Sequence, residues 1–130
     1  MTINTANLAY LDPRLYPLAE TWLEKCSFYF KTRITVTYRG PIDQSECKAE
    51  GLSNAAAGES PHNCVDDKGE PSSRAWDFAI FNDDGSYVTD GTDPRYTLAG
   101  HIAEDMGLAW GGRWNHPDYD HIEMKDWKTT

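Results

Sequence analysis

The sequence has few cysteines and lacks any long apolar run. Its three cysteines, Cys26, Cys47 and Cys64, are an odd number at irregular spacing. This does not fit the framework of a small disulfide-stapled secreted domain, so we expect synthesis in a reducing compartment. No segment approaches the roughly 18 apolar residues of a membrane helix, and the first residues lack the basic and apolar stretches of a secretory signal. We expect neither a membrane span nor a signal peptide.

Basic residues are also scarce, because 12 Lys and Arg stand against 21 Asp and Glu, for a formal charge of -9. This charge repels a nucleic-acid backbone and argues against stable adhesion to anionic membranes. Any wall or surface target must therefore be recognised by a specific site. With 130 residues, 39% of them hydrophobic and 25% charged, we expect one packed domain spanning residues 1–130.

Helical periodicity occurs in two places. Residues 12–30 carry apolar side chains at three- and four-residue steps, with Asp12 as the predicted N-cap and Pro13 in the first turn. Residues 94–110 show the same spacing after Asp93, with Gly107 and the pair Gly111-Gly112 as stop signals. The pattern therefore predicts two helices.

Strand patterns occur at residues 33–38, 75–81 and 121–124, each bounded by turn-forming residues. Residues 42–50 predict a short helix. Residues 51–74 show neither a helical nor a strand period and are predicted to form a long loop. Loops of more than about 12 to 15 structureless residues in compact domains are usually functional or mobile.

Three residues suggest chemistry. Asp77 is a carboxylate inside an apolar strand, where a charge needs a cation, a metal or several hydrogen-bond donors. A salt bridge to Arg or Lys is the simplest explanation. His62 lies in the long loop and His121 opens the last strand, and two imidazoles with one carboxylate suit a catalytic Zn²⁺ that keeps a fourth position open. Spacing alone leaves both interpretations open.

Four segments then carry a resemblance, in this order along the chain: Ser60-Pro61-His62, Arg74-Ala75-Trp76-Asp77, Trp110-Gly111-Gly112-Arg113-Trp114 and Asp118-Tyr119-Asp120-His121-Ile122-Glu123. They resemble the zinc peptidase family of phage L-alanyl-D-glutamate endopeptidases and D-alanyl-D-alanine carboxypeptidases. The resemblance runs from about Val36 to Glu123, and the last two segments are its most specific part. It implies an α+β fold of the D,D-peptidase or hedgehog-like type, with a small antiparallel sheet flanked by helices.

The resemblance also implies roles for individual residues. The metal ligands would be His62, Asp77 and His121, around a zinc ion that polarises the scissile carbonyl and lowers the pKa of its bound water toward roughly 7. The catalytic residues would be Asp118, as general base, and Arg39, which would bind the oxyanion or a substrate carboxylate. The remaining implied roles are substrate binding by Gln44, Ser60 and Trp114 and orientation of an imidazole by Glu123.

The chain departs from the family pattern at two points. The interval from His62 to Asp77 is longer than usual, so residues 63–73 hold an insertion, which we interpret as an outward loop between two retained ligands. Asp120 stands where many relatives have proline.

Other candidates have simpler explanations. His101 fits a structural position on its helix, His116 a solvated loop and Cys64 a free thiol. Coordination by Cys64 as a fourth ligand would instead indicate a structural metal, because catalytic zinc sites usually have three protein ligands.

The resulting hypothesis is a monomeric, zinc-dependent peptidoglycan peptidase, a phage or prophage endolysin, that hydrolyses the stem peptide between L-alanine and D-glutamate. We expect it to be made in the host cytoplasm and to reach the cell wall after release through a holin. The alternatives are a D-Ala-D-Ala carboxypeptidase or dipeptidase and a non-catalytic wall-binding module stabilised by metal.

Overall fold

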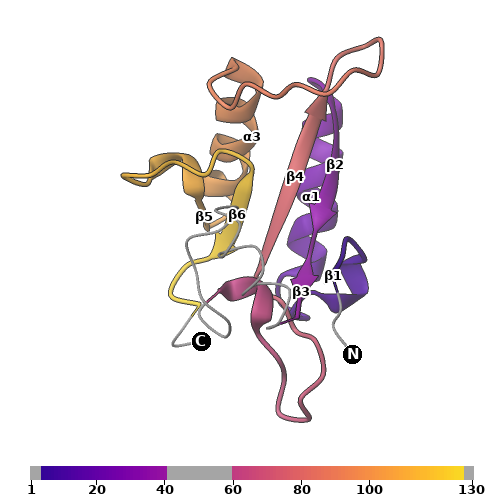
Figure 1. Ribbon diagram of the computed structural model, residues 1–130, viewed down its shortest axis with the longest axis vertical. Helices are drawn as coiled ribbons and strands as arrows, with labels where there is room; N and C mark the ends of the chain where they lie inside the picture. The colour runs from indigo at the N-terminus through magenta and orange to yellow at the C-terminus, as the bar shows by residue number, and fades with distance from the viewer. Residues whose placement is uncertain (1–3, 41–59, 128–130) are drawn as a thin grey trace.

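The computed structural model describes residues 4–40 and 60–127. Its main sheet has four antiparallel strands in the order β2-β4-β6-β5, and a two-stranded sheet pairs β1 with β3 (Figure 1). The elements in chain order are β1 Asn4–Thr5, η1 Leu8–Tyr10, α1 Tyr16–Ser27, β2 Lys31–Val36, β3 Tyr38–Arg39, η2 Pro61–Asn63, β4 Ala75–Phe81, α3 Pro94–Asp105, β5 Leu108–Trp110, η3 Gly111–Arg113 and β6 His121–Met124. The expected α+β class is confirmed.

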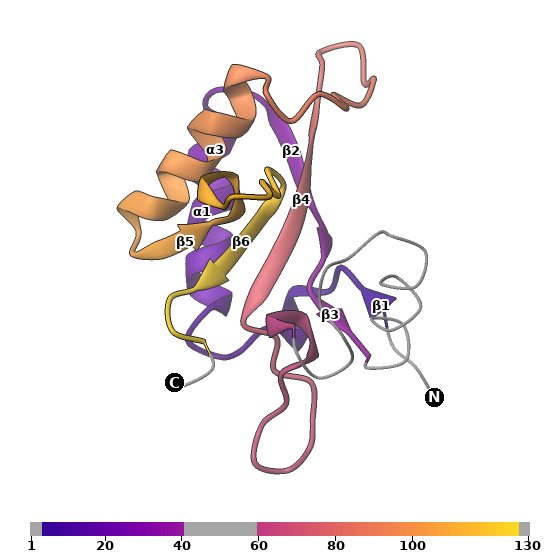
Figure 2. The ribbon, with the colours of Figure 1, turned by 60° about the vertical axis from the view of Figure 1, so that its left-hand side comes forward.

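Helices α1 and α3 cover the same face of the main sheet (Figure 2). Alternate side chains of β4, Trp76, Phe78 and Ile80, are completely buried. The ring of Trp22 in α1 lies 5.4 Å from that of Trp76 and 4.8 Å from that of Phe78, between ring centroids. Because side chains alternate across a strand, Asp77 projects to the opposite face, away from the helices.

The first helix is shorter than predicted. Asp12 is not its N-cap: the Asp12 carboxylate accepts from the backbone N–H of Arg14 at 2.9 Å and closes a turn before the helix, whose N-cap is Leu15. Of the predicted strand at residues 33–38, the structure forms β2, which starts two residues earlier, and β3, with a break at Thr37. The chain changes sheets at this break.

The second helix also ends early. It was predicted to reach residue 110, but Gly107 has a φ of 87°, and the chain continues as β5 instead. The left-handed conformation stops a helix and is easily adopted only by glycine. The strands predicted at residues 75–81 and 121–124 are confirmed with the same bounds. The helix predicted at residues 42–50 lies outside the described residues.

Within the described part of the chain, no helix has both the length and the apolar character needed to cross a membrane.

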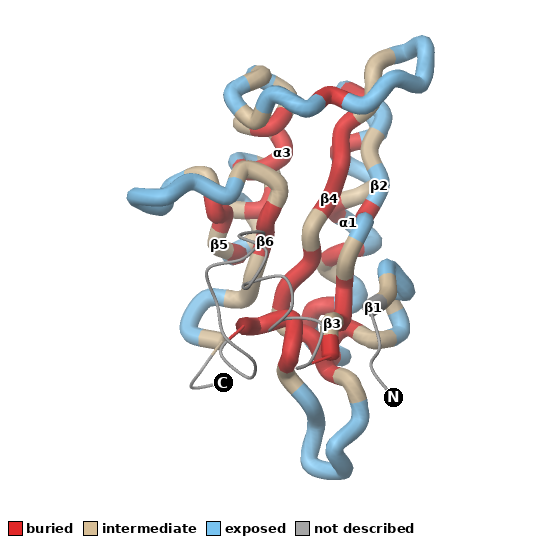
Figure 3. Tube along the Cα trace, viewed as in Figure 1, coloured by how far each residue is buried: buried red, intermediate tan, exposed pale blue. Residues whose placement is uncertain are grey.

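The long loop predicted as structureless is ordered where it is described. After η2, residues 64–72 form a hairpin that projects from the body (Figure 1), with an antiparallel bridge between Val65 and Pro71. Its base is closed by a 2.9 Å hydrogen bond from the Ser72 N–H to the Cys64 carbonyl. The tip is exposed, whereas η2 and most of β4 are buried (Figure 3). The insertion therefore leaves the body and returns to the start of β4.

Trp110 fixes the chain that follows β5. A Cβ atom added at Gly100 or Gly112 would lie 2.1 or 2.2 Å from its indole ring, so both glycines allow close packing against it. The indole Nε1–H donates to the Tyr119 carbonyl at 2.8 Å. These contacts hold residues 111–119 beside the first residue of β6.

Candidate metal centre

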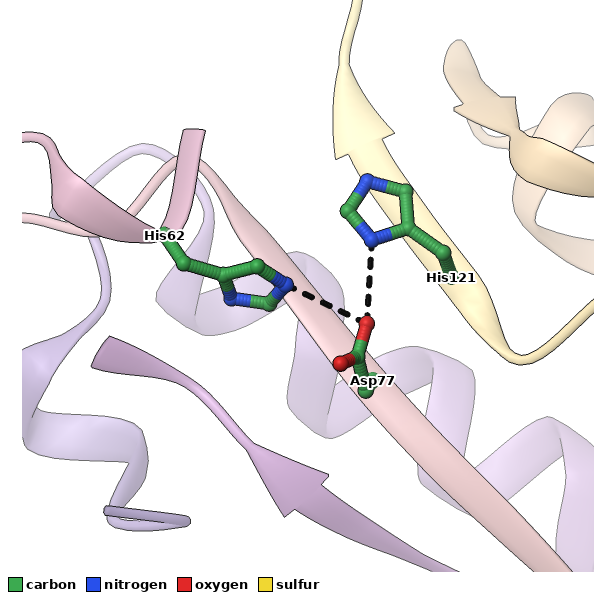
Figure 4. Close-up of side chains that lie close together, drawn as sticks. All are labelled: His62, Asp77 and His121. Atoms are coloured by element: carbon green, nitrogen blue, oxygen red, sulfur yellow. Dashed lines mark hydrogen bonds and ion pairs between the residues drawn. The ribbon is translucent and has the colours of Figure 1, made fainter. Parts of the chain in front are cut away.

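Strand pairing places Asp77 directly opposite His121. The two residues are antiparallel partners on β4 and β6, so their side chains lie on the same face of the sheet. His62 approaches from η2, where the Ser60 hydroxyl accepts from the His62 N–H at 3.2 Å and caps the short helix. Figure 4 shows both imidazole rings turned toward the Asp77 carboxylate.

One oxygen of Asp77 contacts both rings. Asp77 Oδ1 lies 3.2 Å from His62 Nε2 and 2.9 Å from His121 Nδ1. The two histidines are only 3% and 4% exposed. Two ligands of one tetrahedral zinc ion, each about 2.0–2.1 Å from the metal, are separated by about 3.3 Å. The observed spacing is therefore close to that of a shared coordination shell.

The outer nitrogen of each ring determines where its proton lies. His62 Nδ1 is 2.8 Å from the Thr37 carbonyl oxygen, which can only accept, so this nitrogen carries a proton. His121 Nε2 is 2.8 Å from Glu123 Oε1, which likewise accepts when ionised. In the neutral rings, His62 Nε2 and His121 Nδ1 therefore present lone pairs to a carboxylate. Such an arrangement requires a cation between them, either protons or a metal ion, and two nitrogens with one carboxylate oxygen fit zinc.

The pKa values of Asp77 and His121 reflect this need for positive charge. Burial disfavours the charged imidazolium of His121, but hydrogen bonds to Asp77 and Glu123 outweigh burial and raise its pKa to about 10. Burial likewise opposes the charge of Asp77, yet the two histidines hold the pKa of Asp77 well below its usual range. A proton on His121 can therefore supply positive charge at this position.

A tight turn brings Asp118 to the same site. The Asp118 N–H donates to the Gly111 carbonyl at 3.0 Å, and a Cβ at Gly111 would lie 2.4 Å from the Asp118 carbonyl oxygen. Carboxylate oxygens of Asp77, Asp118 and Asp120 lie within 4.8 Å of one another. Asp118 is exposed, so its carboxylate can meet solvent and substrate.

Asp120 is a site residue that sequence reasoning did not assign. Burial, a side-chain hydrogen bond with Asp118 and the charge of Asp77 raise its pKa to about 8. Its carboxyl therefore favours the protonated form at neutral pH. The pair Asp118 and Asp120 just before the last histidine was the available signal, because carboxylates two residues apart in a tight turn can lie close together.

The remaining predicted residues lie at different distances from this centre. Arg39 Nη2 is 3.9 Å from Asp77 Oδ2. The Trp114 ring, 40% exposed, lies 5.2 Å from that of His121 between centroids. The Ser60 hydroxyl caps η2, so its substrate-binding role stays a prediction, and Gln44 lies outside the described residues.

Three alternative candidates lie outside the clusters of metal-binding groups found among the described residues. The His101 ring packs against Trp110 at 6.0 Å between centroids, and His116 is exposed. Cys64 is a free, half-buried thiol. The described part of the chain therefore offers three ligands at the centre and no sulfur.

The metal-free protein should lose stability as pH rises. A group whose folded pKa is raised contributes stability that is fully present below its unfolded pKa and is lost as pH rises through the folded value. For His121 this interval runs from 6.5 to about 10, and Asp120, whose pKa is raised to about 8, acts with the same sign. In the presence of a chelator, calorimetry should show the Tm falling from about pH 6.5 to pH 10.

A His121→Gln variant is the control, because it should show a shallower decline over the same interval. A metal-free wild-type Tm that is constant or rises there would contradict the assigned protonation.

Comparison with known proteins identifies a family for this chain. The sequence profile described as D-alanyl-D-alanine carboxypeptidase, of the peptidase M15 family, matches residues 54–124. That segment includes His62, Asp77, Asp118 and His121, and it covers more than half of the 130 residues. No curated protein matches the chain. Because the match extends over more than half of the sequence, the chain belongs to the D-alanyl-D-alanine carboxypeptidase family of M15 peptidases.

Proposed function

We propose that the protein is a zinc-dependent peptidase that cleaves the stem peptide of bacterial peptidoglycan. The observation that carries this proposal is the convergence of His62 Nε2, His121 Nδ1 and the Asp77 carboxylate, with the exposed Asp118 carboxylate beside them. Membership of a peptidase family supports the reaction type. A bound zinc ion would supply a Lewis acid for the scissile carbonyl and would lower the pKa of a nearby water.

The protein side chains supply proton transfer, positioning and binding of the substrate. Asp118 accepts the proton of the attacking water and returns it to the leaving amine, because its carboxylate borders the centre without being one of the three ligands. Asp120 shares a hydrogen bond with Asp118 and holds its carboxylate at this position. Arg39, beside Asp77, offers a guanidinium to the developing oxyanion or to a substrate carboxylate. Trp114 forms an aromatic wall next to His121.

We propose the bond between L-alanine and D-glutamate as the cleavage point, in a phage or prophage endolysin. The exposed rim at residues 113–118 supports an endopeptidase, because a peptide that continues on both sides of the cut must pass an open edge. A D-Ala-D-Ala carboxypeptidase is the second candidate. It is favoured by the description of the matched profile and by Arg39, which suits a terminal carboxylate.

Digestion of purified peptidoglycan separates these candidates. Mass spectrometry of the products should reveal new L-alanine carboxyl ends and new D-glutamate amino ends. Release of free D-alanine alone would assign the carboxypeptidase reaction instead. A folded, zinc-loaded protein that releases neither product, but sediments with the cell wall, would contradict the peptidase proposal in favour of a binding module.

The purified protein should bind one Zn²⁺ per chain and lose activity when a chelator removes it. His121→Ala should lose metal and activity together, because a site with two protein ligands binds zinc weakly. Atomic absorption gives the stoichiometry, and readdition of zinc should restore activity to the wild type. Full turnover after complete metal removal would contradict the mechanism.

Asp118→Ala should keep the zinc and lower turnover by about 10² to 10⁴, the usual contribution of general acid–base catalysis. Asp77→Ala is the matched comparison, since it removes a carboxylate that is a ligand. Zinc content and kcat should be measured on both variants. Loss of zinc from Asp118→Ala as complete as that from Asp77→Ala would make Asp118 a ligand rather than the base.

A further inference from the structure

We propose that Thr37, held by the N-terminal segment, is a positioning residue for His62 and thereby sets the zinc affinity of the site. The N-terminal segment is defined here as residues 4–12. The inference rests on the proposed function, because it takes His62 as a zinc ligand. It concerns a residue that touches neither the metal position nor the substrate.

Thr37 lies where the chain passes from one sheet to the other. Val36, the last residue of β2, is paired with Asp77 of β4, whereas Tyr38, the first residue of β3, is paired with Thr5 of β1. The Thr37 carbonyl accepts from His62 Nδ1 at 2.8 Å. The break in β2 therefore provides the acceptor that orients the first histidine.

Two donor groups of Thr37, its backbone N–H and its hydroxyl, bond to the N-terminal segment. The Thr37 N–H donates to the Thr5 carbonyl at 2.6 Å. The Thr37 hydroxyl lies 3.0 Å from the Thr5 carbonyl oxygen and 2.7 Å from that of Asn7. Thr37 is completely buried, so neither water nor an alternative partner replaces these bonds at no cost. The position of its carbonyl depends on β1 and the residues that follow it.

The same segment also holds the other end of the loop that carries His62. Leu11 forms a parallel bridge with Ser73, the Ser73 N–H donates to the Tyr10 carbonyl, and the Asp12 N–H donates to the Ser73 carbonyl, both at 2.8 Å. Next to Ser73, the Arg74 N–H donates to the Pro61 carbonyl at 2.9 Å, one residue before His62. The N-terminal segment thus holds His62 from two sides.

The chemical consequence follows from the tautomer of His62. An acceptor at Nδ1 keeps the proton there and leaves the Nε2 lone pair directed at the metal position. Loss of such an outer hydrogen bond typically weakens metal binding by about 10- to 100-fold. Thr37 and residues 4–12 precede the segment matched by the family profile, which begins at residue 54. The residues that position His62 therefore lie outside the matched segment.

The test compares two threonines of the same region. Thr37→Val keeps the carbonyl that accepts from His62 but removes the buried hydroxyl that anchors it, and zinc affinity, measured by competition with a chromophoric chelator, should fall by up to about 10-fold, the lower end of the cost of losing the outer hydrogen bond itself. The matched control is Thr32→Val in β2, whose hydroxyl donates to the Ala79 carbonyl at 2.7 Å, and its affinity should equal that of the wild type. The visible absorption of the Co²⁺-substituted protein should change only in Thr37→Val, and Thr37→Ser, which keeps the hydroxyl, should restore both readouts.

Unchanged zinc affinity and an unchanged Co²⁺ spectrum in folded Thr37→Val would overturn the positioning role, as would equal weakening by Thr32→Val. If Thr37→Val does not fold, Thr5→Ala tests the same attachment, because the Thr5 hydroxyl accepts from the Asn7 N–H at 3.0 Å near the surface and so orders the turn that carries both carbonyl acceptors of Thr37. Weaker zinc binding by Thr5→Ala supports the role and unchanged binding overturns it. A wild-type protein that binds no zinc would contradict the proposed function itself.

Discussion

The pairing of Asp77 with His121 across β4 and β6 is the interaction on which the rest of the site depends. Two antiparallel partners present their side chains on one face at a fixed separation, here with Asp77 Oδ1 2.9 Å from His121 Nδ1. A largely buried carboxylate facing imidazole lone pairs requires a positive charge. The raised pKa of His121 reflects that requirement, and a zinc ion would meet it in the proposed enzyme. Strand register and electrostatics therefore point to the same position.

The neighbouring elements bring the other groups to this position. The projecting hairpin allows a long insertion without separating His62 from β4, because its own backbone bonds close it. The close approach of Gly111 to Asp118 places the proposed base beside Asp77. The helices contribute indirectly, by packing against Trp76 and Phe78 and so fixing the strand that carries Asp77. Each of these elements acts by limiting where one polar side chain can lie.

Features with local causes could be predicted from the sequence. The apolar run and following turn predicted β4. The three residues that the fold brings together were implied by the family resemblance, because the spacing of histidines and carboxylates alone left a salt bridge and a metal site both open. Helical spacing predicted a second helix up to residue 110, but α3 ends before Gly107, one of the stop signals in the sequence. Thr37 could not be predicted, because its contribution is a backbone carbonyl held by residues thirty or more positions away. Asp120 was noted only as a departure, since its altered pKa arises from tertiary neighbours.

Crystals of the full-length protein grown with zinc, measured at the zinc absorption edge, test the central claim most directly. The account predicts one anomalous peak contacting His62 Nε2, His121 Nδ1 and the Asp77 carboxylate, with His121 Nε2 still bonded to Glu123. A peak coordinated by Cys64, a peak that excludes His62, or no peak among these three side chains would contradict it.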